Sequence, residues 1–293
     1  MKFVSYNIQY GFGRDGRYDL ARAVASVADA DVIALQEVER HWRRSNFDDQ
    51  PEIIGRLLPE HYWVYGPAFD MDASFRDGGR LVNRRRQFGT MLLSRTPILW
   101  SRLHLLPMRK AFNPLNTQNP ALEGMINTPA GPIRAMSLHL GHIGVDERLE
   151  QIDFLMARHR NTPFEGGPWS GRDDEPGRDW THGEAEPQAP LDAIWMGDFN
   201  SEPGSREYRR IAGEAPYHDN AVYAGGFVDP LAQQGDFYTH ERQFRGARQR
   251  RRLDYCFVGA GLASRVRRSW IDHEAQGSDH LPVWTEIDLD QQS

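Results

Sequence analysis

The chain has 293 residues, of which 39% are hydrophobic and 26% charged, as in an ordinary soluble globular protein. A net charge of −6 argues against a general nucleic-acid-binding protein. A negative net charge is nevertheless compatible with a local group of basic residues around a binding site. Because Cys256 is the single cysteine and neither a signal peptide nor an apolar run of about eighteen residues is present, we expect a soluble cytoplasmic protein without an intrachain disulfide or a transmembrane helix.

Strands are predicted where β-branched and aromatic residues alternate or form short apolar runs between turn residues. In chain order they cover residues 2–8, 31–37, 62–65, 88–94, 98–105, 121–128, 132–140, 193–196, 253–258 and 281–287. Helices are predicted where apolar residues recur at helical spacing behind a capping side chain. They follow Asp19 and cover residues 51–58, 145–159 and 205–212.

Three polar segments are predicted to lack regular structure. Residues 70–87 are rich in Arg, residues 108–120 are irregular, and residues 163–190 are dense in Gly, Pro, Asp and Glu. No linker separates two hydrophobic halves, so we predict one domain over residues 1–293 with a surface insertion at 163–190. Strands that occur in adjacent groups and also alternate with helices indicate two packed sheets with helices on their outer faces.

Polar side chains stand at the ends of the apolar strands, which is where open α/β architectures place ligands. These residues are Asn7, Glu37, His139, Asp198, Asn200, Asp254, Asp279 and His280. Each alone has a structural explanation, because a strand-end Asp is commonly a turn or cap residue and a lone His is commonly structural. The occurrence of all of them in one chain favours a functional explanation. Hard oxygen ligands without Cys suit Mg²⁺ or Mn²⁺, and an Asp–His pair can orient an imidazole and stabilise its charged form.

The segments around these residues resemble the endonuclease/exonuclease/phosphatase superfamily. The matching segments occur in the family's order at residues 5–8, 35–38, 88–95, 137–140, 197–200, 253–255 and 277–283. Gly-Asp-Phe-Asn at 197–200 and Ser-Asp-His at 278–280 carry most of the specificity. The resemblance implies a four-layer α/β sandwich, with two packed mixed β-sheets flanked by helices and the site at one edge of the sheets.

The resemblance also implies an enzyme that hydrolyses a phosphodiester or phosphomonoester with Mg²⁺ or Mn²⁺. Glu37 would be the main metal ligand, with Asn7 and Asp279 nearby in the metal shell. The oxygen-rich character of these three side chains agrees with that choice of metal.

Five further residues have roles that the resemblance implies. Asp198 would orient or deprotonate the attacking water, and Asn200 would bind the phosphate. His280, held by Asp254, would act on the phosphate or as the general base, so the roles of Asp198 and His280 can be exchanged. His139 would donate a hydrogen bond to a phosphate oxygen.

The sequence departs from parts of the family. The branch that repairs abasic sites usually has Tyr where this chain has His139, which makes that branch a poorer match. Gln9 lies where some nucleases carry a second acid near the metal, which puts a second metal site in doubt. His142 forms a His-x-x-His pair with His139, and we interpret His142 as substrate-facing or structural.

Two basic clusters, at residues 84–86 and 248–252, are predicted to lie in loops. We expect Arg250, Arg251 and Arg252 to contact substrate phosphate, because guanidinium groups match phosphate oxygens. The acidic total charge and the acidic 163–190 segment favour a small or lipid-derived phosphate ester. A nuclease acting on DNA or RNA is the alternative. An inactive binding module is disfavoured because every expected site position is filled, and no protein partner can be inferred.

Overall fold

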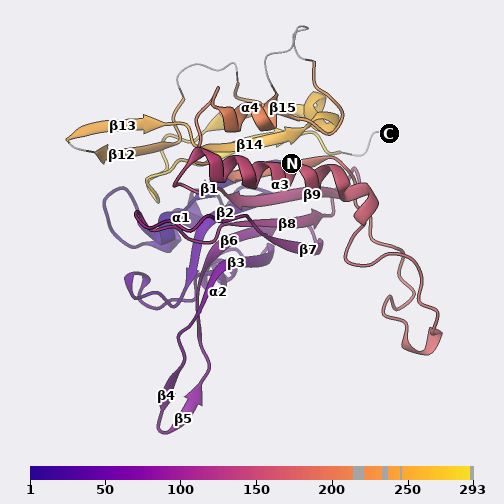
Figure 1. Cartoon of the computed structure of the whole chain (residues 1–293), viewed down its shortest axis with the longest axis horizontal. Coiled ribbons are helices and arrows are strands. Elements are labelled where there is room, and N and C mark those ends of the chain that lie inside the picture. The colour runs from indigo at the N-terminus through magenta and orange to yellow at the C-terminus, as the bar shows by residue number, and fades with distance from the viewer. Residues whose placement is uncertain (214–220, 233–236, 245, 291–293) are drawn as a thin grey trace.

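The computed structural model describes residues 1–213, 221–232, 237–244 and 246–290, and two six-stranded sheets form its centre (Figure 1). The first sheet consists of β1 (Lys2–Asn7), β2 (Val32–Arg40), β3 (Tyr62–Asp72), β6 (Arg85–Ser94), β15 (Val266–Ile271) and β16 (Val283–Ile287). Its strand order is β15-β16-β1-β2-β6-β3. Strands β1 and β2 are parallel, whereas β2 and β6 are antiparallel, so the sheet is mixed.

The second sheet has the order β11-β14-β10-β9-β8-β7. It consists of β7 (Ile98–Leu105), β8 (Pro120–Ile126), β9 (Ile133–His139), β10 (Ala193–Asp198), β11 (Phe227–Val228) and β14 (Asp254–Gly259). Strands β9 and β10 are parallel, and β8 and β9 form an antiparallel hairpin.

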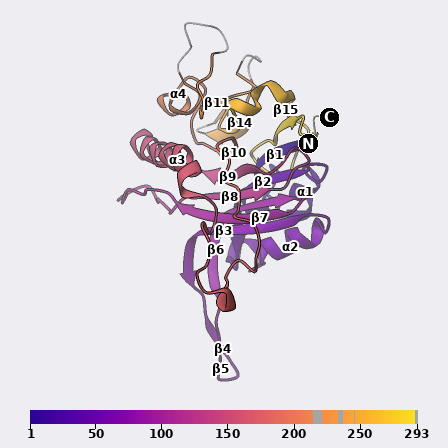
Figure 2. The same ribbon diagram turned by 90° about the vertical axis from the view of Figure 1, so that its right-hand side faces the viewer.

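Helices cover the outer face of each sheet (Figure 2). α1 (Leu20–Ala25) and α2 (Gln50–Leu57) pack on the first sheet, and α3 (Val145–Glu165) and α4 (Arg206–Ala212) pack on the second. Short 3₁₀ helices are η1 (Gln9–Gly11), η2 (Arg43–Ser45), η3 (Pro176–Arg178) and η4 (Ala260–Arg265). A third apolar cluster fills the space between the sheets. This arrangement confirms the predicted four-layer α/β sandwich.

Two hairpins correct the expectation that the basic clusters lie in loops. β3 and β6 continue beyond the sheet until Asp72 pairs with Arg85, and β4 (Phe75–Asp77) and β5 (Arg80–Val82) form the tip that projects from the body in Figure 1. Gly78 and Gly79 both have positive φ, as a tight hairpin turn requires. The second cluster lies on β12 (His240–Phe244) and β13 (Ala247–Arg251). In the second hairpin polar cross-strand pairs replace the apolar alternation that marks a strand in a sequence.

Other differences are smaller. Helix α3 runs to Glu165 through Pro163, so the segment expected to be an insertion begins inside a helix. Strands β11 and β15 and the two hairpins were not predicted. The N-cap of α1 is correct, because the Asp19 side chain accepts the backbone N–H of Arg22. Among the described residues no helix is long and apolar enough to cross a membrane.

Candidate active site

The strand ends bring the predicted polar residues to one edge of the paired sheets. In the second sheet His139, Asp198 and Asp254 are register partners on three adjacent strands. Gly197 allows β9 and β10 to approach each other at this point, since a Cβ there would lie 2.0 Å from the backbone oxygen of Leu138. The close approach sets the spacing between the side chains of His139 and Asp198.

Glu37 occupies a β-bulge in the first sheet. The pairing of β2 with β6 shifts between Gln36 and Val38, and Glu37 itself has a φ of 60°. A bulge changes the direction in which the side chain of its extra residue points. A left-handed backbone conformation at a non-glycine residue raises the free energy of the folded state by roughly 1–3 kcal/mol. Glu37 lines a cleft at this edge. The local strain therefore accompanies a carboxylate that points away from the regular face of the sheet.

Asn7 connects the acids of the two sheets. Its Nδ2 donates to Oε1 of Glu37 at 3.0 Å and to Oδ2 of Asp198 at 3.1 Å. Its Oδ1 accepts the backbone N–H of Gln9, and the Gln9 side chain donates to Oδ2 of Asp279 at 3.0 Å. Gln9 thus bonds to one of the expected metal ligands instead of adding a further carboxylate.

His280 and Asp254 form a buried pair. Nδ1–H of His280 donates to Oδ2 of Asp254 over 2.8 Å, while Nε2 of His280 lies 3.7 Å from Oδ2 of Asp198. Burial lowers the pKa of His280, but the carboxylates around it, foremost Asp254, outweigh burial and raise it to about 10. Burial also raises the pKa of Asp254, against the lowering effect of the imidazolium. Because three carboxylates surround one imidazole, the charged His280 is the favoured form at neutral pH.

Asp198 lies between the two histidines and fixes Asn200. Oδ2 of Asp198 is 3.6 Å from Nε2 of His139, and Oδ1 accepts the backbone N–H of Asn200 at 2.9 Å. This turn holds Asn200 at a φ of 48°, a conformation that Asn tolerates well. The Asn200 amide lies 3.2 Å from Nε2 of His139 and donates to the Leu140 oxygen. These side chains form one hydrogen-bonded group.

The group lies in a cleft of about 630 Å³. Of the predicted residues, the following line it: Glu37, His139, His142, Asp198, Asn200, Arg251, Asp279 and His280. Asn7 and Asp254 are fully buried behind this surface, where they orient their neighbours. The cleft is large enough for a small molecule.

The three arginines expected to bind phosphate have different surroundings. Arg252 turns inward, where its Nη2 donates to both carboxylate oxygens of the buried Asp229, so its guanidinium is not open to a ligand and the prediction for it is corrected. Arg250 bonds to Glu241 at 2.7 Å on an exposed face of the hairpin. Arg251 reaches the cleft, because alternate residues of a strand point to opposite faces.

Several residues of the cleft were not predicted. His240 on β12 places Nε2 3.5 Å from Oδ2 of Asp279, and its ring lies 4.6 Å from that of His280. The other residues that line the cleft are Gln9, Tyr10, Trp42, Arg44, Phe69, Phe88, Leu115, Thr117, Asn119, Arg242 and Leu253. Phe88 and Leu253 belong to predicted strands, whereas most of the others come from segments without apolar periodicity. No sequence signal identified His240, because β12 carries no apolar alternation.

The donor set fits a hard divalent cation. Glu37 and Asp279 offer carboxylate oxygens, and the Asn7 oxygen has a second lone pair beside the one that accepts from Gln9. Within the described part of the chain, neither carboxylate forms an ion pair with Lys or Arg. The two acids share one partly buried cleft, and a bound cation would compensate their negative charge.

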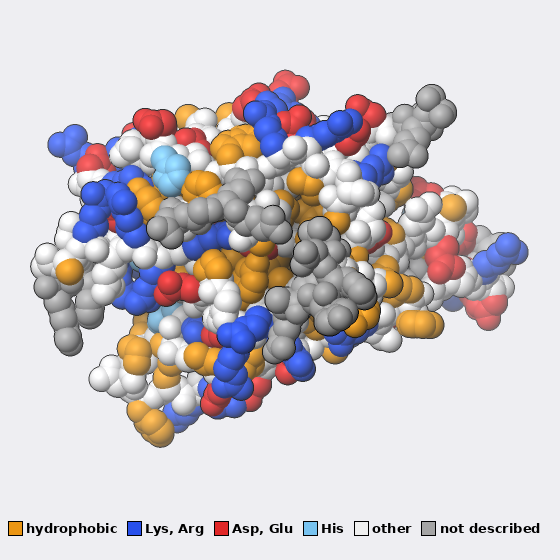
Figure 3. Space-filling view, turned by 90° about the horizontal axis from the view of Figure 1, so that it is seen from above, with side chains coloured by type: hydrophobic (Ala, Val, Ile, Leu, Met, Phe, Trp, Pro, Cys, Tyr) orange, Lys and Arg blue, Asp and Glu red, His pale blue; other side chains and the backbone are white. Residues whose placement is uncertain are grey.

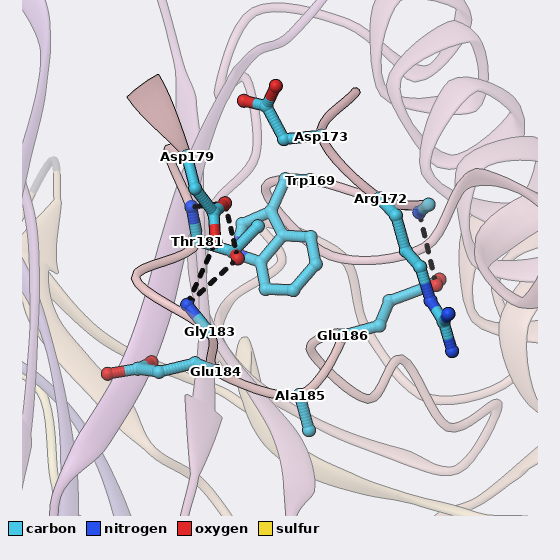
Figure 4. A pocket seen from close by; sticks show the side chains of 10 residues that line it. Trp169, Arg172, Asp173, Asp179, Thr181, Gly183, Glu184, Ala185 and Glu186 are labelled. Atoms are coloured by element: carbon cyan, nitrogen blue, oxygen red, sulfur yellow. Dashed lines mark hydrogen bonds between the residues drawn. The ribbon is translucent and has the colours of Figure 1, made fainter. Parts of the chain in front are cut away.

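A second hollow, of about 650 Å³, lies in the segment after α3 (Figure 4). The ring of Trp169 occupies its centre, and Asp179 accepts hydrogen bonds from Thr181 and from the backbone of Gly183. On the other side Glu186 accepts the backbone N–H of Gly171. None of the predicted site residues lines this hollow. Its acids mainly shape the loop itself.

Comparisons with known proteins agree with the fold. Residues 4–280 match the model of the endonuclease/exonuclease/phosphatase family. A mannosyl-6-phosphatase from Bacteroides thetaiotaomicron has 18% identity and a TM-score of 0.61, over 98% of this chain and 99% of that chain. The 3′ phosphatase NExo from Neisseria, bound to a product DNA hairpin, has 18% identity and a TM-score of 0.57, over 98% and 99%.

The catalytic domain of human Nocturnin has 17% identity and a TM-score of 0.57, over 97% of this chain and 93% of that domain. At these identities the solved structures show a shared fold. A search of curated protein sequences found no match.

Proposed function

The chain belongs to the endonuclease/exonuclease/phosphatase family, and we propose that it is a divalent-metal-dependent phosphoesterase that hydrolyses a small phosphate ester. The observation that carries this proposal is the convergence of polar side chains from five strand ends and from the bulge in β2 on one edge of the paired sheets, where a cleft opens. The carboxylates of Glu37 and Asp279 line this cleft together with His280. The buried acid Asp254 holds His280 in place through a hydrogen bond. A metal site beside a positioned imidazole suits the hydrolysis of a phosphate ester.

Glu37, Asn7 and Asp279 would hold Mg²⁺ or Mn²⁺. When bound, such a cation polarises a phosphoryl oxygen and neutralises the negative charge that develops on it. The chain prepares this site before any cation arrives, because Asn7 bonds to Glu37 and Gln9 bonds to Asp279. Glutamine at position 9 supports one fully equipped metal site and not two.

Asp198 is the proposed group that orients the attacking water. One of its oxygens fixes the turn to Asn200, and the other faces both His139 and His280. Asn200 and His139 would donate hydrogen bonds to the phosphate oxygens. The carboxylates around His280, foremost Asp254, raise its pKa against the effect of burial, so we assign it a hydrogen bond to the phosphate and assign the water to Asp198.

The charges around the cleft support a small substrate over a nucleic acid. Arg248 and Arg250 both pair with Glu241, and Arg85 pairs with Asp70 on the other hairpin. Basic and acidic side chains are also interspersed on the face shown in Figure 3. A binder of a long polyanion usually presents a continuous basic face. Two structural neighbours are named as phosphatases, one for a mannosyl phosphate and one bound to DNA.

A nuclease is the second candidate. Arg242 and Arg251, both on the β12–β13 hairpin, line the cleft and could follow a phosphate backbone. A substrate panel separates the two candidates. The purified protein with Mg²⁺ or Mn²⁺ is assayed on p-nitrophenyl phosphate, bis-p-nitrophenyl phosphate, phospholipids, plasmid and single-stranded DNA, and RNA. Turnover of the small esters and resistance of the polymers is the expected result, and preferential cleavage of DNA or RNA would refute it.

A further inference from the structure

One wall of the cleft is a stack of aromatic rings and one guanidinium group. The Arg44 guanidinium carbon lies 3.7 Å from the ring centre of Tyr10 and 4.8 Å from that of Trp42. The rings of Trp42 and Phe69 are 5.3 Å apart. All four side chains line the same cleft as His280. The catalytic roles proposed above leave this wall without a function.

The wall is built before any ligand binds. Nε and Nη2 of Arg44 donate to the fully buried carboxylate of Glu39, which also accepts from the Ser45 hydroxyl at 2.6 Å. Nε1 of Trp42 donates to the backbone oxygen of Gln87 at 2.8 Å. These bonds hold Arg44 and Trp42 in place. The aromatic rings of the wall therefore lie in fixed positions, where a ligand can contact them.

Two observations place the wall beside the reacting centre. Tyr10 directly follows Gln9, whose side chain bonds to Asp279. From the loop before β8, Leu115 also lines the cleft although its side chain is 79% exposed. A ligand in the cleft would thus have within reach the apolar wall, Leu115 and the acids that are proposed to bind the metal, because all of them line the same cleft.

The Arg44–Glu39 ion pair indicates which kind of ligand group the wall can bind. Because a buried carboxylate compensates the charge of Arg44, the wall has little need of a second anion. Fixed aromatic faces favour a flat ring, since stacking is an attraction that every π face offers. Resting on the phosphoesterase function proposed above, we propose that Tyr10, Trp42 and Phe69 bind the leaving group, and that the substrate is a phosphate ester whose alcohol carries a planar aromatic ring.

Phenylphosphonate and methylphosphonate test this subsite without turnover, because neither has an ester bond to hydrolyse. Their dissociation constants are measured by calorimetry on the full chain with Mg²⁺. We expect phenylphosphonate to bind about ten-fold more tightly. Trp42→Ala should remove most of this preference and leave methylphosphonate affinity unchanged, whereas Trp42→Phe should retain it.

Trp270→Ala is the matched control. Trp270 also carries a guanidinium over its ring, that of Arg268 at 4.5 Å, and it stacks on Trp284 away from the cleft. This variant should lower the melting temperature and keep the ratio of the two dissociation constants. It separates a loss of stability from a loss of the subsite.

Equal dissociation constants for the two phosphonates in the wild type would overturn the proposal. So would an equal weakening of both by Trp42→Ala, which would mean that Trp42 only shapes the cleft. If the preference depends on Trp42 but no phosphate ester is hydrolysed, the subsite stands and the phosphoesterase function fails. Binding and turnover are thus judged separately.

Discussion

Nδ1 of His280 lies 2.8 Å from Oδ2 of Asp254, although 26 positions separate the two residues. Strand β14 of the second sheet begins at Asp254, and His280 precedes β16 of the first sheet. The contact therefore bridges the two sheets at the edge that carries the candidate site. A bridge of this kind holds one imidazole in a single orientation, and its removal should affect catalysis more than stability.

His280→Ala and Asp254→Ala should each lower kcat by several orders of magnitude if the two residues act as one unit. The double variant should then lose little more than the worse single variant, because the parts of one catalytic unit are not additive. Steady-state kinetics and melting temperatures of the two single variants and the double variant measure this coupling. Strictly additive losses would contradict it.

Asp254→Asn tests whether the acid has a structural role only. The amide keeps the shape but cannot stabilise an imidazolium as a carboxylate does. We expect a large loss of kcat with a melting temperature close to that of the wild type. A variant that melts earlier but turns over normally would show that Asp254 supports the strand and not the reaction.

Metal dependence should trace to Glu37. EDTA should abolish turnover and Mg²⁺ or Mn²⁺ should restore it, since Glu37, Asp279 and Asn7 offer hard oxygen ligands. Glu37→Gln keeps the shape and removes the charge, so it should raise the metal concentration needed for half-maximal activity. Circular dichroism checks that the fold is retained. Undiminished activity in the metal-stripped protein would refute the dependence.

Arg251 and Arg250 form a matched pair on neighbouring positions of one strand. Arg251→Ala should raise KM for anionic substrates, most strongly at low salt, because its side chain lines the cleft. Arg250→Ala should have little effect, because its guanidinium is occupied by Glu241 and by the ring of Tyr238 at 4.2 Å. KM measured at two ionic strengths decides the outcome, and identical effects of both variants would speak against a cleft-specific role.

The sequence predicted the site better than its surroundings. Asn7, Asp198 and Asp254 follow or begin apolar strands, and the hydrophobic pattern of those strands is visible without a structure. Parallel strands then place their ends at the same edge. The family motifs added the roles of the residues, which strand positions alone do not give.

The cleft walls could not be predicted in the same way. His240 and Arg251 lie on a hairpin whose residues are mostly polar on both faces, so no alternation marks it. The inward turn of Arg252 depends on Asp229, a partner 23 positions away that no local pattern identifies. Trp42 bonds to Gln87 of β6, and β6 pairs with β3, which carries Phe69, so the two rings meet. Such contacts arise only from the fold.

Acid should destabilise the protein through a buried cluster on the second sheet. Burial raises the pKa of Glu123, but its bonds to His104 and Arg134 outweigh burial and lower the pKa to about 2 from an ordinary 4.5. Burial, and then the charge of Arg134, lowers the pKa of His159 to about 4 from an ordinary 6.5. In both cases the unfolded chain binds the proton more readily, so protonation favours unfolding.

The free energy of unfolding should therefore fall as the pH drops from 6.5 to 4 through His159, and again from 4.5 to 2 through Glu123. The His159 contribution would be up to about 3 kcal/mol, from about 1.4 kcal/mol for each unit of pKa shift. Urea unfolding of the wild type and of His159→Gln between pH 7 and pH 4 measures it, because glutamine does not titrate. The variant should be less stable at pH 7, where its packing is poorer, but its stability should fall less steeply with acid. Parallel curves for the two proteins would show that His159 does not contribute to the pH dependence.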